Sequence, residues 1–147
     1  MKSFRKNSVM GSVFVAGLSA LLLSGTASAL EPHIEKAVKQ GKEIFTHETF
    51  GGNGKVCQSC HLDGGMKPGK LPNGKAVPRL TNAATIFPRY RARDNRVITL
   101  SDQIMSCVAG GLKGKPPAYG SEELNSLVSY VTSLSQGKKM NMGGKLK

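Results

Sequence analysis

The segment Cys57-Gln58-Ser59-Cys60-His61 restricts what this chain can fold into more than any other. C-x-x-C-H is the attachment signal of c-type haem. The two thiols add to the vinyl groups of the haem, and the adjacent imidazole becomes an axial ligand of the iron. Two intervening residues let one short turn reach both vinyl groups, and the next residue then lies under the iron. We therefore predict one haem c, bound covalently through Cys57 and Cys60, with His61 as an iron ligand.

Two other kinds of site use paired thiols, and both fit this sequence less well. A zinc site needs four ligands, and Cys107 would have to join Cys57, Cys60 and His61. The adjacent side chains of Cys60 and His61 diverge, however, which is unfavourable on one tetrahedral ion. A redox-active dithiol motif belongs in an α/β pattern, and the sequence shows no such alternation. Haem attachment is therefore the favoured interpretation.

Residues 1–29 have the pattern of a secretory signal peptide. A positively charged start precedes an apolar or small stretch over residues 10–23, and Ala-Ser-Ala at 27–29 forms a cleavage site. The apolar stretch is shorter than the roughly 20 residues of a spanning helix. We therefore predict removal of this leader, export to the periplasm or beyond, and no integral membrane segment in the mature chain.

The mature chain, residues 30–147, is predicted to be a single basic domain. Three of the 21 Lys and Arg residues leave with the leader, so 18 remain against nine Asp and Glu. Export argues against nucleic acid as a partner, whereas a basic exported redox protein can meet acidic partner proteins through electrostatic steering. A solvated surface tuned for solubility accounts for the charge equally well. Chains of this size have marginal cores, and a buried haem would add apolar surface.

Apolar spacing and capping residues predict helices. The first begins near Ile34 and ends before the glycines at 51–54. Thr99 is an N-cap with Asp102 in capping-box position, and Gly110-Gly111 is expected to end the short helix that follows. Each of these helices has one apolar stripe, which indicates packing around a common core.

The remaining segments complete the predicted fold. Ser121 caps the last helix, and Gly137 is a stop signal. Residues 62–80 are predicted to be a loop and residues 81–96 to be irregular, and a flexible basic tail is expected from about residue 138. No segment has strand periodicity long enough for a sheet. We predict an all-α, class I-like cytochrome c domain wrapped around the haem.

The second axial ligand decides what the haem can do. In small exported cytochromes with this helix order, the usual methionine comes from the loop before the last helix. Here that loop is residues 110–120, which contains no methionine. At 100° per residue, Cys107 falls beside the inward-facing Leu100 and Ile104, whereas Met105 points away. We therefore predict that Cys107 is the second iron ligand.

Other assignments of the second ligand stay open. The alternatives are Met105, Met140, Met142 and, less favourably, His33 and His47. Cys107 itself would then be a small buried hydrophobe. Thiolate ligation would stabilise Fe(III) and lower the reduction potential, and loss of the thiolate on reduction would open a position for nitric oxide or carbon monoxide. We also expect His61 to donate its free N–H to a backbone carbonyl, with Pro78 in the right region.

Several segments resemble the haem domains of thiosulfate dehydrogenases and related sulfur-oxidising cytochromes. They are Phe87-Pro88-Arg89-Tyr90, Thr99-Leu100, Ile104 with Cys107, Ser121-Glu122-Glu123-Leu124 and Leu134-Ser135. The resemblance covers roughly residues 56–137. It implies that a cysteine at the position of Cys107 is an axial haem ligand. Those dehydrogenases carry two haem domains per chain, whereas this sequence has one C-x-x-C-H.

The sequence is also similar in size and ligand set to the small single-haem His/Cys cytochromes of anaerobic ammonium-oxidising bacteria, which implies paired chains and binding of nitric oxide or carbon monoxide. Three functions therefore compete. They are a low-potential electron-transfer protein or redox subunit, a haem protein that binds a diatomic gas, and a subunit of a sulfur-compound (thiosulfate) oxidoreductase. The first is the leading prediction, because it needs no feature beyond the single haem, and the chain is expected to work with a partner in a homo- or heterodimer.

Overall fold

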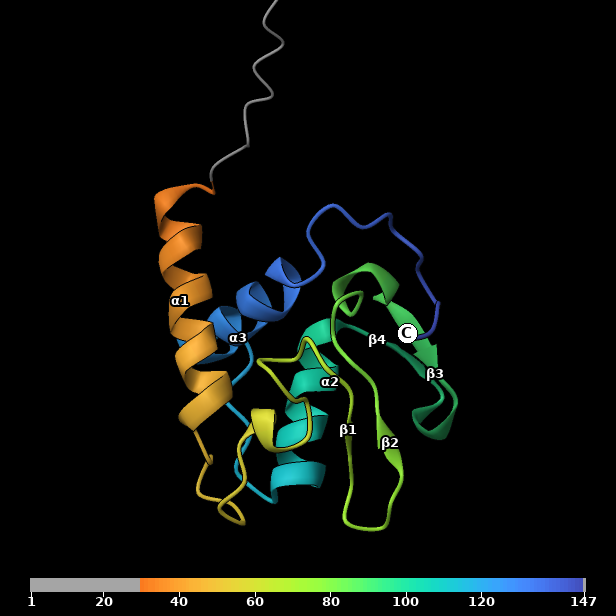
Figure 1. The fold of residues 1–147 in the computed structure, drawn as a ribbon. Helices are drawn as coiled ribbons and strands as arrows, with labels where there is room; N and C mark the ends of the chain where they lie inside the picture. The colour runs from red at the N-terminus through yellow and green to blue at the C-terminus, as the bar shows by residue number, and fades with distance from the viewer. Residues whose placement is uncertain (1–29, 147) are drawn as a thin grey trace, which may run out of the picture.

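The computed structural model describes residues 30–146, so the predicted leader lies outside the described residues. This part of the chain contains α1 (Pro32–His47), α2 (Leu100–Cys107) and α3 (Glu122–Ser133). Figure 1 shows α1 and α3 crossing on one side, α2 in the middle, and two short β-hairpins on the other side. No helix in residues 30–146 is long and apolar enough to cross a membrane.

A glycine lets α1 and α3 cross at close range. Gly41 is buried in α1, and a Cβ added there would lie 1.9 Å from the carbonyl oxygen of Ser126 in α3. One turn further along α1, the ring of Phe45 meets the ring of Tyr130 edge-on, with centroids 5.3 Å apart. Tyr130 also donates its hydroxyl to the Gly64 carbonyl at 2.7 Å. The helix crossing therefore also holds the segment that follows the C-x-x-C-H motif.

Both predicted helix caps are confirmed. Thr99 Oγ1 accepts from the main-chain N–H of Asp102 at 3.2 Å, and the Asp102 carboxylate accepts from the Thr99 N–H at 2.8 Å. This reciprocal pair is a capping box. Ser121 Oγ accepts from the N–H of Leu124 at 3.2 Å. Glu31, which the sequence did not suggest, caps α1 by accepting from two main-chain N–H groups of its first turn.

The prediction of an all-α fold is confirmed only in part, because the described chain is mostly helical but also contains short strands. β1 (Gly69–Lys70) pairs antiparallel with β2 (Ala76–Val77), and β3 (Arg89–Arg91) pairs antiparallel with β4 (Arg96–Ile98). Strands of two or three residues are too short to show alternation in the sequence. Both hairpins lie in regions predicted to be loop or irregular. Asn95, with φ of 50°, takes the left-handed conformation between β3 and β4, which asparagine tolerates well.

The short helix α2 does not end at Gly110-Gly111 as predicted. After Cys107 the chain continues as a π-helical turn, η4 (Val108–Leu112), and leaves it at Lys113, whose φ is 57°. Lys113 therefore has the left-handed conformation that glycine usually adopts at a helix end. Wide turns of this kind are frequent at functional sites. Here the change from α to π geometry falls at Cys107.

The core consists of two clusters. The larger joins α1, α3 and η4, and its buried members are Phe45, Phe50, Leu80, Ala83, Val108, Leu112, Leu127, Tyr130 and Val131. Cys57 packs against this cluster. The smaller cluster consists of Ile86, Phe87 and Ile98. Ile86 is the last residue of the 3₁₀ turn η2 (Ala84–Ile86), and Ile98 is the last residue of β4. A further 3₁₀ turn, η3 (Ala92–Asp94), lies between β3 and β4.

The basic tail, expected to be flexible, follows a path defined by contacts with η2. The Asn141 N–H donates to the Thr85 carbonyl at 2.8 Å, and the Gly143 N–H donates to the Ile86 carbonyl at 3.0 Å. Leu146 packs against both core clusters. Figure 1 shows the tail passing over the top of the domain and down towards β3. Main-chain N–H groups of the tail thus satisfy two carbonyls in the turn η2.

Candidate haem site

The C-x-x-C-H motif forms one tight turn. Cys57 opens the 3₁₀ turn η1 (Cys57–Ser59), and its carbonyl accepts from the N–H groups of Cys60 at 3.2 Å and His61 at 3.0 Å. The Ser59 hydroxyl accepts from the Val56 N–H at 3.0 Å. Both thiols and the imidazole therefore come from a single hydrogen-bonded turn, which is the arrangement that haem attachment requires.

His61 is held in one orientation by a backbone carbonyl. Its Nδ1 lies 3.0 Å from the carbonyl oxygen of Pro78, as expected from the sequence. A carbonyl only accepts, so Nδ1 carries the proton and Nε2 is left with its lone pair for a metal. Burial lowers the pKa of His61, and the hydrogen bond to Pro78 partly opposes that shift. The imidazole is therefore in the neutral form that binds metals.

Cys107 lies close enough to Cys57 to affect its protonation. Burial, and to a smaller extent the charges of Cys107 and Cys60, raise the pKa of the Cys57 thiol to about 12. All three cysteines are free. The turn η1 and the end of α2, which are about fifty residues apart in the sequence, thus bring their sulfur atoms into one region.

The loop before the motif is tied to the turn that follows Cys107. The Asn53 N–H donates to the Leu112 carbonyl at 2.8 Å, and the Asn53 side-chain amide donates to the Gly111 carbonyl at 3.3 Å. Gly52 permits this approach, because a Cβ there would lie 2.1 Å from the Leu112 carbonyl oxygen. These backbone contacts fix the position of the attachment turn relative to the end of α2.

The β1–β2 hairpin packs against the attachment turn from another side. A Cβ added to Gly69, the first residue of β1, would lie 2.1 Å from the carbonyl oxygen of Cys60. Pro78 directly follows β2, so the same hairpin supplies the hydrogen-bond partner of His61. No sequence pattern marks Gly69 for this role. The close approach depends on how the hairpin folds back onto the turn.

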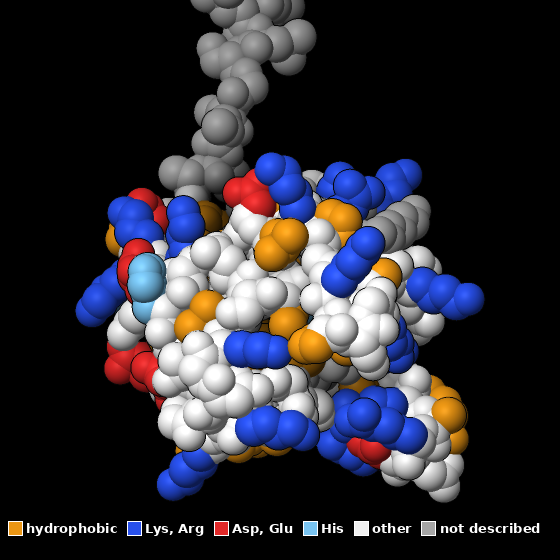
Figure 2. All heavy atoms as spheres, turned by 60° about the horizontal axis from the view of Figure 1, so that its bottom comes forward, with side chains coloured by type: hydrophobic (Ala, Val, Ile, Leu, Met, Phe, Trp, Pro, Cys, Tyr) orange, Lys and Arg blue, Asp and Glu red, His pale blue; other side chains and the backbone are white. Residues whose placement is uncertain are grey.

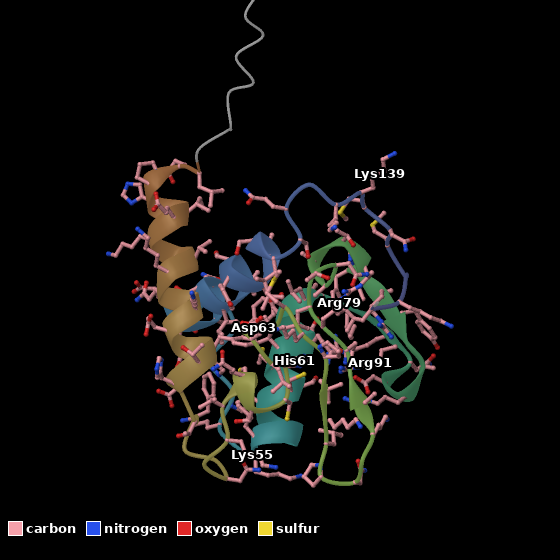
Figure 3. All side chains as sticks on the ribbon, viewed as in Figure 1. Lys55, His61, Asp63, Arg79, Arg91 and Lys139 are labelled. Carbon is pink, nitrogen blue, oxygen red and sulfur yellow. The ribbon has the colours of Figure 1, made fainter. Side chains whose placement is uncertain are left out.

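Cys107 is the last residue of α2, and its side chain is accessible. Gln103, one turn earlier, has its side-chain Nε2 3.3 Å from Cys107 Sγ. Sequence analysis missed this contact, although the spacing of four residues on a helix is the signal that would have suggested it. Figure 3 shows His61 in the centre of the domain beside α2, with Arg91 towards the β3 side.

The structure places the other candidate ligands on the surface or on another part of α2. They are Met105, Met140, Met142, His33 and His47. Met105 is half-buried on α2, while Met140 and Met142 are 64% and 67% exposed in the tail. The two histidine side chains are 92% and 75% exposed. Cys107 is exposed too, which differs from the inward orientation predicted from helical phase. It is distinguished from the other candidates by the hydrogen bond from Gln103 and by its place next to the turn that Asn53 binds.

The donor set suits a haem c. Two free thiols and a neutral imidazole lie on one turn, and a third free thiol lies at the end of α2. Within residues 30–146, no three His, Cys, Asp or Glu side chains gather closely enough to hold a bare metal ion. A haem iron differs in this respect, because the porphyrin supplies four of its ligands and the protein needs to supply at most two.

Lys and Arg side chains are numerous on the surface of the domain (Figure 2). Figure 2 shows many Lys and Arg side chains over the lower face, with hydrophobic side chains between them and few acidic ones. In Figure 3, Lys55 lies at the lower end of the domain and Lys139 at the upper end, with Arg79 and Arg91 between them. Lys and Arg residues are therefore spread over several elements of the fold, and of these Arg91 is only 13% exposed and is paired with Asp94.

The attachment turn, the helix order and the thiol at the end of α2 define a c-type cytochrome domain. Comparison with protein families gives its particular kind. The profile described as "SoxA/TsdA, cytochrome c domain" matches residues 40–140. The chain belongs to this family and is a c-type cytochrome domain of the sulfur-oxidation type. Haem c is attached covalently through Cys57 and Cys60.

Curated relatives agree with the family. The chain is 31% identical over 105 residues to the thiosulfate dehydrogenase of Stutzerimonas stutzeri (strain A1501), which covers 68% of this chain and 32% of the relative. It is 32% identical over 107 residues to the thiosulfate dehydrogenase of Thiomonas intermedia (strain K12), which covers 69% of this chain and 32% of the relative. The chain thus matches about a third of the length of these proteins.

Solved structures share the fold. Thiosulfate dehydrogenase (TsdBA) from Marichromatium purpuratum superposes with a TM-score of 0.60 at 24% identity, covering 79% of this chain and 26% of that one. SoxXA from P. pantotrophus superposes with a TM-score of 0.51 at 23% identity, covering 76% of this chain and 39% of that one. The fold is therefore that of a cytochrome c domain, with the short strands described above.

Proposed function

We propose that this chain is an exported redox subunit that serves the oxidation of a sulfur compound such as thiosulfate, with its haem iron held between His61 and Cys107. Membership of the family supports the assignment to sulfur chemistry. The observation that supports the ligand assignment is the place of Cys107 at the end of α2, just before the turn that Asn53 ties to the loop preceding the attachment motif.

Each proposed ligand has a defined part in this function. Pro78 keeps the proton of His61 on Nδ1, so Nε2 would be available as a neutral donor to the iron. Cys107 contributes an anionic sulfur, which favours Fe(III) over Fe(II) and so lowers the reduction potential. When bound, the haem supplies one-electron exchange.

The electron count favours a partner. Joining two thiosulfate ions through a new S–S bond releases two electrons, while one haem iron accepts one. This sequence has one C-x-x-C-H and matches about a third of the length of its relatives. We therefore infer that a second redox centre, on another cytochrome or on a second copy of this chain, takes the other electron.

The surface charge suits both an anionic substrate and an acidic partner. In residues 30–147, Lys and Arg outnumber Asp and Glu by 18 to nine. Charge of one sign on a surface accelerates the encounter with ions and proteins of opposite sign. Electron transfer to an acidic partner should therefore slow as ionic strength rises, because salt screens such attraction.

Export completes the proposal. Residues 1–29 carry the features of a cleavable leader, and cytochromes with C-x-x-C-H are consistent with a periplasmic setting. Mass spectrometry of the purified protein tests leader removal and haem attachment together, since the mature mass should correspond to residues 30–147 plus one haem. A mass that retains the first 29 residues would contradict the leader assignment.

The ligand assignment is tested by Cys107→Ala, with Met105→Leu on the same helix as the matched control. Electron paramagnetic resonance and absorption spectra of the Fe(III) proteins are measured. We expect a low-spin thiolate signal in the wild type and in Met105→Leu, and its loss in Cys107→Ala. A methionine-to-iron charge-transfer band that persists in Cys107→Ala would refute the assignment and point to Met140, Met142 or Met105.

Substrate and gas are tested separately. Thiosulfate is added with an artificial electron acceptor, with and without a candidate partner cytochrome, and haem reduction is followed. No reduction under either condition would argue against the sulfur-compound function. Carbon monoxide added to the reduced protein tests the alternative of gas binding, because rapid formation of a carbon monoxide complex would show that the iron gives up a ligand on reduction.

A further inference from the structure

We propose that Gln103 is a positioning residue that raises the reduction potential of the haem by donating a hydrogen bond to the sulfur of Cys107. This inference rests on the proposed His61/Cys107 ligation and adds a residue that controls it. The side-chain Nε2 of Gln103 lies 3.3 Å from Cys107 Sγ. A side-chain amide carries no titratable proton, so this donor keeps its character over the whole pH range in which the protein is folded.

The helix holds this donor in place. Gln103 and Cys107 are four residues apart on α2, so their side chains lie on the same face. The main-chain N–H of Gln103 donates to the Thr99 carbonyl at 3.1 Å, and the capping box of Thr99 and Asp102 fixes the start of the helix. Gln103 is half-buried, which restricts the rotamers that its side chain can adopt.

The surroundings of Cys107 show what the hydrogen bond from Gln103 can fix. The π-helical turn η4 begins immediately after it, and the carbonyl of Leu112 at the end of that turn is bound by Asn53. Cys107 therefore lies between helix α2, which ends at it, and a turn whose far end is tied to Asn53. Its side chain can still rotate about χ1, and a hydrogen bond from Gln103 favours the one rotamer that directs the sulfur towards its donor.

The electrostatic consequence has a definite sign. Reduction adds one electron to a centre that already includes an anionic sulfur, so the reduced state is the more negative of the two. The positive end of an N–H dipole beside the sulfur stabilises the more negative state to a greater extent. Hydrogen bonds to ligating sulfur are a recognised means by which proteins tune metal centres, and those to charged acceptors are the stronger ones.

The test uses Gln103→Leu in the full haem-loaded protein. Leucine has a helix propensity close to that of glutamine but has no donor. Gln136→Leu, at an exposed position in the turn after α3, is the matched control. We expect Gln103→Leu to keep the low-spin thiolate signal and to favour oxidised over reduced protein about tenfold more, which is a lowering of about 59 mV for a one-electron couple. Gln136→Leu should match the wild type.

Two outcomes would overturn the inference. One is a thiolate signal that persists in Gln103→Leu with less than a twofold change in the redox equilibrium. The other is loss of the thiolate signal in Gln103→Leu, because Gln103 would then be required for ligation itself and not for tuning. Both differ from failure of the proposed ligation, which would appear as a spectrum that does not change in Cys107→Ala.

A second measurement covers the case in which the variant does not fold. The Fe–S stretching vibration of the wild-type protein is recorded by resonance Raman spectroscopy in H₂O and in D₂O. A hydrogen-bonded sulfur should show a shifted band after exchange of the amide protons. An unshifted Fe–S band would count against a hydrogen bond at this sulfur.

Discussion

The close crossing of α1 and α3 gives the sharpest prediction for stability. Gly41→Ala would place a Cβ 1.9 Å from the carbonyl oxygen of Ser126 and 2.8 Å from the Cβ of Tyr130. The Ser126 oxygen belongs to the backbone of a helix, so no side-chain rotation relieves the overlap. The two helices must separate, and the packing of Phe45 against Tyr130 must loosen with them.

The magnitude follows from two opposing effects. Overpacking a tight contact costs about 1–3 kcal/mol, and a backbone collision belongs at the upper end of that range. Replacing glycine by alanine inside a helix contributes about 1 kcal/mol in the other direction. The net loss should be about 2 kcal/mol, a substantial part of the about 5–15 kcal/mol that holds a domain folded. The Tm should fall by about 5–10 °C.

Chemical and thermal unfolding of the haem-loaded protein, followed by circular dichroism, measure this loss. Lys42→Ala is the matched control, because Lys42 is the next residue on α1 and is exposed, and its change should stay within about 0.5 kcal/mol of the wild type. A Gly41→Ala protein as stable as Lys42→Ala would refute the reasoning, since the helices would then not need glycine at their crossing.

Two further predictions concern the attachment turn and the start of α2. Gly69→Ala should push β1 away from the carbonyl of Cys60, which would destabilise the domain by about 1–3 kcal/mol and disturb the surroundings of His61. Lys70→Ala is the matched control. Equal unfolding midpoints for the two variants would contradict the prediction. The Thr99 N–H and then the Arg96 guanidinium lower the pKa of Asp102 to about 2. Its stabilising effect should therefore be complete above its unfolded pKa of about 4 and be lost as the pH falls towards 2. Asp102→Asn should show a smaller loss of stability on acidification in urea titrations, and identical acid profiles would rule the effect out.

Contacts between distant segments give the site its geometry. Asn53, just before the motif, binds two carbonyls of the turn after Cys107. The β1–β2 hairpin meets the turn at Gly69 and supplies Pro78 to His61. The attachment turn is thus held by backbone contacts on two sides, which accounts for the need for glycine where the backbones come closest.

Local chemistry was predictable from the sequence. The haem attachment residues, the Thr99 capping box and the Ser121 cap each depend on residue types at fixed short spacings. Spacing of this kind determines local hydrogen bonding and reactivity regardless of the rest of the fold. The leader pattern lies outside the described residues and stays a prediction.

The hairpins, the π-helical turn and the path of the tail were not predictable in the same way. Strands of two or three residues leave no periodic signal, and η4 continues through the two glycines that favour a stop at that point. Lys113 adopts a left-handed conformation that its residue type does not predict, whereas Asn95 adopts one that asparagine tolerates well.

The sequence by itself determined that this chain attaches a haem c at Cys57 and Cys60, and it offered a short set of candidate iron ligands. The sequence suggested Pro78 as the partner of His61, and the tertiary structure showed that its carbonyl reaches Nδ1. Only the tertiary structure decided that the β1–β2 hairpin packs on the attachment turn at Gly69 and that Gln103 contacts the sulfur of Cys107. The physical reason is range. Covalent attachment depends on residues within one turn of the chain, whereas the orientation of ligands depends on groups that only folding brings together.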